Sequence, residues 1–323
     1  MEYTRLGRTG LKVSRLCLGT MNFGWGTDEP ASYTIMDAAL EAGINFFDTA
    51  NVYGWKLGEG ATEQIIGRWI KQGGGRREKL VLATKAYNAM GTWPNTSGLS
   101  ALHIRTACED SLRRLKTDHL DLYQFHHIDR SCPWEEVWQA CEVLVKQGKV
   151  IYFGSSNFAG WHIAQAQEAA KSRHFLGLVC EQTKYSLLCR TPELEVLPVC
   201  AGYGLGFIPY SPIGGGALGG GATKGKGVRR QHDWTKGDVK KFKKTLEAYE
   251  RLCAKWGHAP ADVAVAWALA NPVVTAPIIG PRTLDQLKGS LRSVKIKLKE
   301  AQLKALDGLF PGPGGTAPEA YAW

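Results

Sequence analysis

Four ionisable side chains follow apolar runs in the sequence, and their types suit acid–base chemistry. Asp48 ends the run INFFD and Tyr53 follows it by five residues, whereas Lys85 ends VLATK and His126 ends LYQFH. A free phenol, with a pKa of about 10, is a poor acid near neutrality, but an ammonium held beside it favours the phenolate. If Asp48 fixes Lys85 in place, Tyr53 becomes a tuned general acid, and His126 can then polarise or orient a bound carbonyl. Such a group needs a hydride from outside, which implies a nicotinamide cofactor.

Eight short apolar runs, rich in β-branched and aromatic residues, predict the strands that must position these side chains. The runs are almost continuously apolar, as is typical of strands buried on both faces of a parallel sheet. They are RLCLGT, INFFDTA, KLVLATK, LDLYQFHH, VIYFGSSN, LVCEQTKY, GLGFIPYSP and VVTAPIIG.

Amphipathic stretches between most of these runs predict helices. They are Tyr33–Ala42, Thr62–Lys71, Ala101–Leu115, Glu135–Lys146, His162–Lys171, Asp262–Ala270 and Leu284–Leu291. Eight strand–helix units in 323 residues predict an α/β fold, a (β/α)₈ barrel of one domain covering residues 1–323. Two segments fall outside the alternation: Gly214–Gly227 predicts a loop after the seventh strand, and Val239–Lys255 predicts an extra helix.

Polar residues stand where nearly every predicted strand ends. They are Thr20, Asp48, Lys85, His126, Ser156, Asn157, Gln182 and Ser211. Any one of them has an ordinary alternative, such as capping the helix that follows. Because the carboxyl ends of all eight strands of such a barrel meet at one face, together they predict an active site at the C-terminal face.

The positive charge is concentrated in one part of the chain. The formal charge is +10, and residues 224–304 hold 18 Lys and Arg against 7 Asp and Glu. This excess indicates either a solvated helical face or a field that attracts an anionic cofactor or nucleic acid. No nucleic-acid motif accompanies it, so we expect no nucleic-acid partner.

The cysteine pattern and the apolar segments indicate in which compartment the protein is expected. The chain has 8 Cys without a C-x-x-C pair, which argues against a disulfide framework and against a structural zinc site, and we expect no metal. No apolar stretch is long enough to span a membrane, and the N-terminal residues lack the apolar core of a secretory signal. We therefore expect a cytoplasmic protein. The sequence leaves its oligomeric state open.

Motifs along nearly the whole chain resemble those of the aldo-keto reductases. They are TRLGRTGLKVSRLCLGTMNFG, FFDTANVYG, VLATK, DLYQFHH, GSSNF, EQTKYSLL, PYSPIGGGAL and IIGPRTLDQL, in the order of that family. The resemblance implies that Tyr53 is the general acid, that Asp48 and Lys85 tune it, and that His126 completes a catalytic tetrad. It also implies NADPH bound in an extended conformation over the rim of the barrel.

The resemblance assigns the cofactor positions from the nicotinamide end to the adenosine end. Gly19, Thr20, Met21 and Asp48 border the nicotinamide and its ribose; Ser156, Asn157 and Gln182 bind the carboxamide; Tyr210 stacks on the ring; Ser211, Pro212, Ile213 and Gly214 line the pyrophosphate; Gly280, Arg282, Gln286 and Ser290 hold the adenosine end. Arg282 favours NADPH over NADH, because a guanidinium is a multi-donor partner for a 2′-phosphate.

The chain departs from the family pattern at two cofactor positions. Gly220 and Gly221 stand where many relatives have a Gly-Lys pair that reaches the pyrophosphate, so Lys224, Lys226, Arg229 or Arg230 is a candidate substitute. Ser290 stands where an Asn is common, and this leaves adenine recognition open.

Aromatic residues on predicted rim loops suggest the substrate. Trp25, Trp55 and Trp93 can pack against sugars or aromatic aldehydes, or simply against the barrel, and His127 is a further substrate contact. We expect a small aldehyde or sugar-derived carbonyl. Two alternatives are an NAD(P)-dependent sugar lactol dehydrogenase and a cofactor-binding regulatory subunit resembling potassium-channel β subunits.

Overall fold

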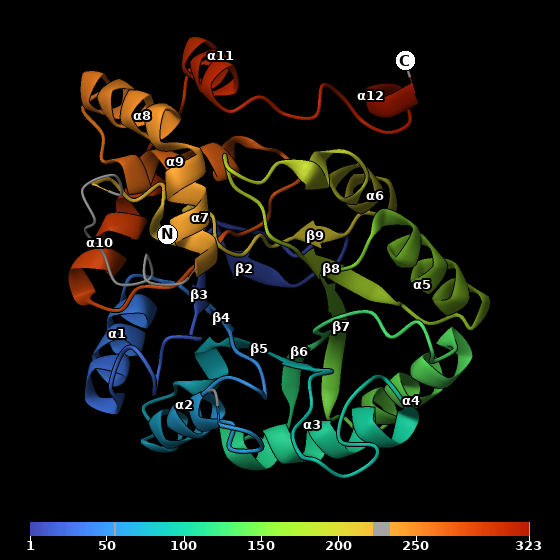
Figure 1. Cartoon of the computed structure of the whole chain (residues 1–323). Helices are drawn as coiled ribbons and strands as arrows, with labels where there is room; N and C mark the ends of the chain where they lie inside the picture. Colours follow the sequence, from blue (N-terminus) through green and yellow to red (C-terminus); the bar gives the residue numbers. More distant parts are fainter. Residues whose placement is uncertain (55, 222–232, 323) are drawn as a thin grey trace.

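The computed structural model describes residues 1–54, 56–221 and 233–322. Eight parallel strands form one curled sheet in the order β10-β3-β4-β5-β6-β7-β8-β9 (Figure 1). The strands are β3 (Cys17–Gly19), β4 (Phe46–Asp48), β5 (Val81–Ala86), β6 (Leu120–Phe125), β7 (Val150–Ser156), β8 (Leu178–Gln182), β9 (Gly206–Phe207) and β10 (Ile278–Ile279). Hydrogen bonds from Thr275 N to Phe207 O and from Ile278 N to Pro209 O, both 2.8 Å, join the two ends of the sheet. The predicted (β/α)₈ barrel is confirmed, and each strand lies within its predicted run except β5, which extends one residue beyond it to Ala86.

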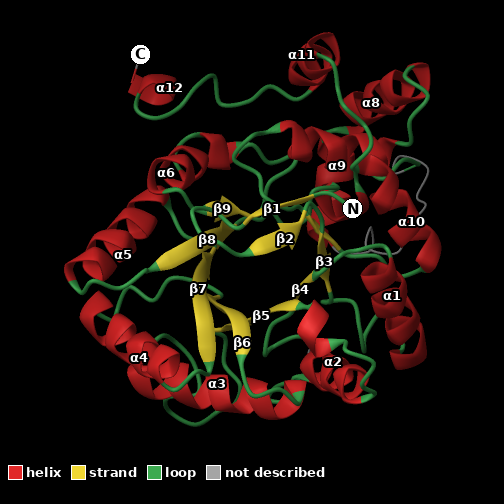
Figure 2. Cartoon of the chain, turned by 180° about the vertical axis from the view of Figure 1, so that it is seen from behind, coloured by secondary structure: helices red, strands yellow, loops and turns green. Residues whose placement is uncertain are grey.

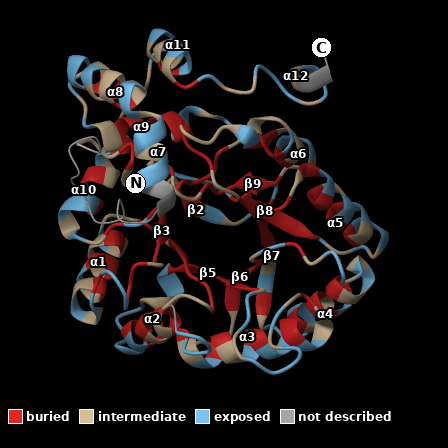
Figure 3. Ribbon diagram, in the orientation of Figure 1, coloured by how far each residue is buried: buried red, intermediate tan, exposed pale blue. Residues whose placement is uncertain are grey.

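Helices surround the sheet, as both views of the chain show (Figures 1 and 2). They are α1 (Glu29–Glu41), α2 (Ala61–Lys71), α3 (Ala101–Leu115), α4 (Trp134–Lys146), α5 (Gly160–Ser172), α6 (Val196–Tyr203), α9 (Pro260–Ala270) and α10 (Leu284–Ser293). Helix α1 begins four residues before the predicted start, because Asp28 caps it by accepting from Ala31 N at 2.9 Å. The strands of the barrel are mostly buried, with Ile151 of β7 as an exposed exception, and the helices turn one face to solvent (Figure 3).

The extra helix predicted over Val239–Lys255 is wrong in its extent. The structure has two helices there, α7 (Asp233–Lys241) and α8 (Lys243–Lys255), which are divided at Phe242. Two further helices, α11 (Glu300–Leu309) and α12 (Glu319–Ala322), follow α10. The predicted loop after the seventh strand begins with a short 3₁₀ turn, Gly214–Gly216, while its residues 222–227 lie outside the described ranges.

A hairpin closes the amino end of the barrel. Strands β1 (Tyr3–Arg5) and β2 (Lys12–Ser14) pair antiparallel, and Leu6 and Val13 are fully buried in the same apolar cluster as the inward-facing strand residues. At Gly7, next to this cluster, an added Cβ would lie 2.5 Å from Gly204 O, just before β9 begins. The hairpin therefore fills one end of the barrel, and only the carboxyl ends of the strands remain open for a site.

Candidate active site

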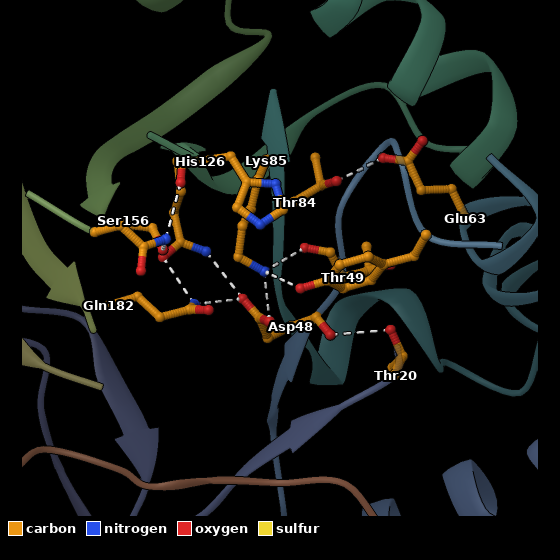
Figure 4. Close-up of polar contacts among 12 residues, drawn as sticks. Thr20, Asp48, Thr49, Glu63, Thr84, Lys85, His126, Ser156 and Gln182 are labelled. Carbon is orange, nitrogen blue, oxygen red and sulfur yellow. Dashed lines mark hydrogen bonds and ion pairs between the residues drawn. The ribbon is translucent and has the colours of Figure 1, made fainter. Parts of the chain in front are cut away.

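Asp48 and Lys85 form a buried ion pair between neighbouring strands. Asp48 is the last residue of β4, and Lys85 lies in β5, with Lys85 Nζ 2.6 Å from Asp48 Oδ2 (Figure 4). The lysine side chain is fully buried, and its ammonium also donates to Thr49 O at 2.8 Å. Burial alone lowers the pKa of Lys85, but Asp48 and Tyr53 outweigh this effect and raise the pKa above its usual value. The ammonium therefore stays charged at neutral pH.

The other oxygen of Asp48 is held by two amides. Gln124 Nε2 and Gln182 Nε2 each donate to Asp48 Oδ1 at 2.9 Å, from β6 and β8 respectively. Together with Lys85, these bonds engage both carboxylate oxygens. A buried ion pair is stable only when its remaining hydrogen-bonding groups are satisfied, and this condition is met here.

Tyr53 reaches the same ammonium from the loop after β4. Lys85 Nζ lies 3.2 Å from Tyr53 OH and 5.0 Å from the centre of the phenol ring. A positive charge at this distance stabilises a phenolate relative to a phenol. Since Tyr53 is only partly buried and lines the large cavity of the structure, its hydroxyl is accessible to a small molecule there.

His126 follows β6 and borders the phenol. Its ring centre lies 5.9 Å from that of Tyr53, with the two planes at 79°. Burial, with the nearby Lys85 and His127, lowers the pKa of His126 to about 3, so the imidazole is neutral near pH 7. Its Nδ1 atom is buried and has no hydrogen-bond partner within the described part of the chain. A neutral imidazole keeps one N–H donor, which can orient a carbonyl oxygen while Tyr53 supplies the proton.

A cavity of about 850 Å³ runs along the carboxyl ends of the strands. Tyr53 and His126 line it together with Asn88 at one part of the wall, and Arg282 and Arg292 line another part. The predicted cofactor residues in its wall are Gly19, Thr20, Met21, Asp48, Ser156, Asn157, Gln182, Tyr210, Ser211, Pro212, Ile213, Gly280, Arg282, Gln286 and Ser290. Gly214 is not in the wall, but its neighbours Gly215 and Gly216 are.

Asn157 organises the turn after β7. Its backbone adopts a left-handed conformation with φ +61°, which Asn tolerates better than most residues. Its Nδ2 donates to His126 O at 3.1 Å and to Ser156 Oγ at 3.0 Å, and its Oδ1 accepts from Tyr210 OH at 2.9 Å. The Ser156 hydroxyl accepts from Asn157 and so keeps its own proton for a ligand.

Arg282 and Gln286 shape the far end of the cavity. Gln286 Oε1 accepts from Arg282 N at 2.8 Å, which fixes the backbone at the start of α10. Burial lowers the pKa of the Arg282 guanidinium, and that group forms no ion pair with any described residue. A partly buried cation that lacks a carboxylate partner is suited to an anionic ligand.

Three of the four predicted substrate residues lie apart from the cavity wall. Trp25 and Trp93 are 49% and 80% exposed, and neither lines the cavity. His127 is exposed, packs on Tyr87 with 5.4 Å between ring centres, and is also absent from the wall. Trp55 lies outside the described residues, as do Lys224, Lys226, Arg229 and Arg230.

The sequence did not point to several residues of the site. Gln124 precedes His126 by two positions, so the two-residue period of a strand places both on one face and was a usable signal. Lys184, Asp262 and Arg292 also line the cavity. Lys184 follows Gln182 by two positions, so the same strand period was a usable signal for it. No local pattern marks Asp262 and Arg292, because they reach the wall only through packing of distant elements.

A second buried carboxyl supports the turn after β7. Glu181 of β8 is fully buried and accepts hydrogen bonds from Ser155 Oγ, from Thr183 Oγ1 at 2.5 Å and from Phe158 N at 3.1 Å. Burial raises the pKa of Glu181 to about 7, although the bonds from Ser155 and Thr183 lower it in part. Glu181 thus ties β8 to the turn that carries Asn157.

Glu181 should make the stability of the fold depend on pH. Between pH 4.5 and 7 the folded state retains a proton that the unfolded chain has lost, so the free energy of unfolding falls as pH rises. Glu181→Gln should remove roughly 2–3 kcal/mol of this fall, as measured by urea unfolding at pH 5 and pH 8. The exposed Glu41→Gln is the matched control and should keep the parent's pH dependence. An unchanged pH dependence in Glu181→Gln would contradict the assignment.

Comparison with known proteins shows the family of this chain. The model of the "Aldo/keto reductase family" matches residues 15–310. The chain belongs to the aldo-keto reductase family. It is therefore an oxidoreductase of a family that uses a nicotinamide cofactor, as the resemblance implied. Among its described residues, no helix combines the length and the apolar character needed to cross a membrane.

Three proteins of similar sequence are named for different functions. "Uncharacterized oxidoreductase YrpG" of Bacillus subtilis is 56% identical over 100% of both chains. "Versiconal hemiacetal acetate reductase" of Aspergillus parasiticus is 32% identical over 95% of this chain and 96% of its own. "Probable voltage-gated potassium channel subunit beta" of Oryza sativa is 31% identical over 92% of both. The relatives thus include a named reductase and a named channel subunit.

Proposed function

We propose that this aldo-keto reductase uses NADPH to reduce the carbonyl group of an aldehyde or ketone, with Tyr53 as the general acid. The observation that carries the proposal is the 3.2 Å contact between Tyr53 OH and Lys85 Nζ in the wall of an open cavity. The contact joins an accessible proton donor to a buried cation that stabilises the donor's conjugate base. This arrangement suits proton delivery to an oxygen that gains negative charge.

The side chains of the tetrad divide the work of proton transfer. NADPH, when bound, supplies the hydride that reduces the carbonyl carbon. Tyr53 donates its hydroxyl proton to the carbonyl oxygen, and the Lys85 ammonium stabilises the phenolate that remains. Asp48 holds Lys85 in position from the opposite side. His126 stays neutral and orients the carbonyl oxygen beside Tyr53.

The cavity wall fits an extended dinucleotide. At one end, Ser156 has a hydroxyl proton to donate, and we assign it with Asn157 and Gln182 to the nicotinamide carboxamide. Glycines 215, 216 and 219 line the middle and leave room for a bulky anion. At the far end, Arg282 offers a guanidinium that no described carboxylate engages, and we assign it to the 2′-phosphate of NADPH.

Removing the Arg282 guanidinium should weaken NADPH much more than NADH. A hydrogen-bonded charge of this kind contributes roughly 1.5–3 kcal/mol, so Arg282→Ala should raise the Kd of NADPH roughly 10- to 100-fold. The Kd of NADH should change little, because NADH lacks the 2′-phosphate. Quenching of tryptophan fluorescence by each dinucleotide measures both constants. Arg105→Ala removes the same charge from an exposed site on α3 and should leave both unchanged; equal loss of both dinucleotides in Arg282→Ala would contradict the assignment.

The second part of the proposal concerns the substrate class. We assign small aldehydes and sugar-derived carbonyls, with Trp25, Trp93 and His127 as outer contacts on the rim loops. One relative is named for the reduction of a hemiacetal acetate, which is a masked carbonyl. A panel of such carbonyls tests the proposal by the oxidation of NADPH followed in absorbance. Protein that binds NADPH but turns over no member of the panel would overturn it.

The same groups serve the reverse reaction, since Tyr53 as phenolate can accept the proton of a sugar lactol. Rates measured in both directions, with NADPH and with NADP⁺, decide between a reductase and a lactol dehydrogenase. A cofactor-binding regulatory subunit needs no proton donor, and one relative is named as a potassium channel subunit. The contact of Tyr53 with Lys85 therefore favours an enzyme.

A further inference from the structure

The far end of the cavity is built by two helices that pack on each other. On α10, Gln286, Gly289 and Ser290 recur at the three- and four-residue spacing of one helical face, and all three line the cavity. On α9, Ala261, Asp262 and Val265 line the opposite part of the same wall. This end of the cavity therefore presents two small apolar side chains, Ala261 and Val265, among polar groups.

An ion pair joins the two helices at this place. Arg292 Nε of α10 lies 3.0 Å from Asp262 Oδ2 of α9, and Asp262 is only 5% exposed. Asp262 Oδ1 accepts no hydrogen bond from any residue that the structure describes. The Arg292 side chain is 62% exposed, and its terminal nitrogens make no hydrogen bond within residues 1–54, 56–221 and 233–322. The pair thus keeps one acceptor and several donors available.

Gly289 opens the wall in front of this pair. A Cβ added at Gly289 would lie 3.4 Å from Arg292 Nη2 and 3.5 Å from Asp262 Oδ1. A guanidinium donor and a carboxylate acceptor therefore flank the same small space, which the absence of a side chain at this position leaves free. A ligand edge with a donor beside an acceptor would complement them.

We propose that Asp262 and Arg292 form an adenine-reading pair, in which the carboxylate accepts from the exocyclic amine and the guanidinium donates to a ring nitrogen of the base. Adenine presents such an edge, an N6 amine beside the N7 acceptor. The inference rests on the proposed function, since it requires the adenosine end of a dinucleotide near Arg282. It also accounts for adenine recognition where Ser290 has replaced a longer amide.

A change of base tests the pair separately from the rest of the cofactor. Reduced nicotinamide hypoxanthine dinucleotide phosphate differs from NADPH at the base, where a carbonyl oxygen replaces the N6 amine and would face the Asp262 carboxylate. The parent protein should bind NADPH roughly 10- to 100-fold more tightly than this analogue, as measured by tryptophan fluorescence quenching at pH 7. Asp262→Asn should bring the ratio of the two Kd values close to one, because an amide can either accept from the amine or donate to the carbonyl.

Two further variants separate base recognition from phosphate recognition and from folding. Arg282→Ala should weaken both dinucleotide phosphates and keep their ratio. Arg292→Gln leaves Asp262 unpaired and should weaken NADPH while the NADPH-to-NADH ratio stays as in the parent; it is the second test if Asp262→Asn does not fold. Binding of both dinucleotides without discrimination by the parent, or full discrimination by Asp262→Asn, would overturn this inference alone. Failure of the parent to bind either dinucleotide would overturn the proposed function and the inference with it.

Discussion

Tyr53→Phe should lower kcat for carbonyl reduction by roughly 10²- to 10⁴-fold, the range in which a positioned general acid contributes. The substitution removes one oxygen, and the ring remains beside His126 at the cavity wall. The ion pair between Lys85 and Asp48 does not involve the phenol oxygen, so it should persist in this variant. The Kd of NADPH should therefore stay near the parent value while turnover is lost.

Steady-state rates and fluorescence quenching by NADPH, measured on the same preparation, check both parts of this expectation. Tyr87→Phe is the matched control, because it removes a phenol oxygen on the following loop from a ring that packs on His127 outside the cavity wall. It should retain the parent kcat. Reduction by Tyr53→Phe at the parent rate would refute the assignment of the general acid.

Lys85→Met should cost the fold roughly 3–5 kcal/mol in the free energy of unfolding, because it leaves a buried carboxylate without its cation. Gln124 and Gln182 still donate to Asp48 Oδ1, but neither supplies a positive charge. Turnover should fall as well, since the phenolate of Tyr53 loses its stabilising ammonium. Urea unfolding followed by circular dichroism measures the first effect, and the NADPH assay the second.

A double substitution separates the two effects. Asp48→Asn together with Lys85→Met replaces the ion pair by neutral groups of similar volume, so a large part of the lost stability should return. Catalysis should not return, because no cation remains near Tyr53. If Lys85→Met alone is as stable as the parent, the energetic role of the pair is wrong; if the double variant regains turnover, the catalytic role of Lys85 is wrong.

The barrel and the gathering of the tetrad could be predicted because both depend on local signals. A short apolar run predicts a buried strand. In a (β/α)₈ barrel the carboxyl ends of all strands lie at one face, whatever the sequence between the strands. Hence Asp48 and Lys85, on neighbouring strands, were expected to meet, and they do at 2.6 Å. The one-domain organisation and the individual roles of the site residues stay predictions.

Other features have no comparable local signal. Helix α6 was missed because Val196–Tyr203 is apolar around its circumference and contains Pro198, which the first turn tolerates. Asp262 and Arg292 are 30 residues apart and meet only because α9 packs on α10. The exposure of Trp25 and Trp93 likewise depends on loop conformation, and loops lack the hydrophobic periodicity by which helices and strands are predicted.

The hairpin of β1 and β2, which closes the amino end of the barrel, affects which parts of the sequence can be replaced without loss of folding. Leu6 and Val13 close the amino end of the barrel, so residues that stabilise the fold are concentrated at that end and the site residues lie at the carboxyl ends of the strands. Loops at the carboxyl ends of the strands can be exchanged or lengthened with little disturbance of the closed amino end. New specificities are thus within reach of loop replacement alone, and a library confined to the rim should retain mostly folded members.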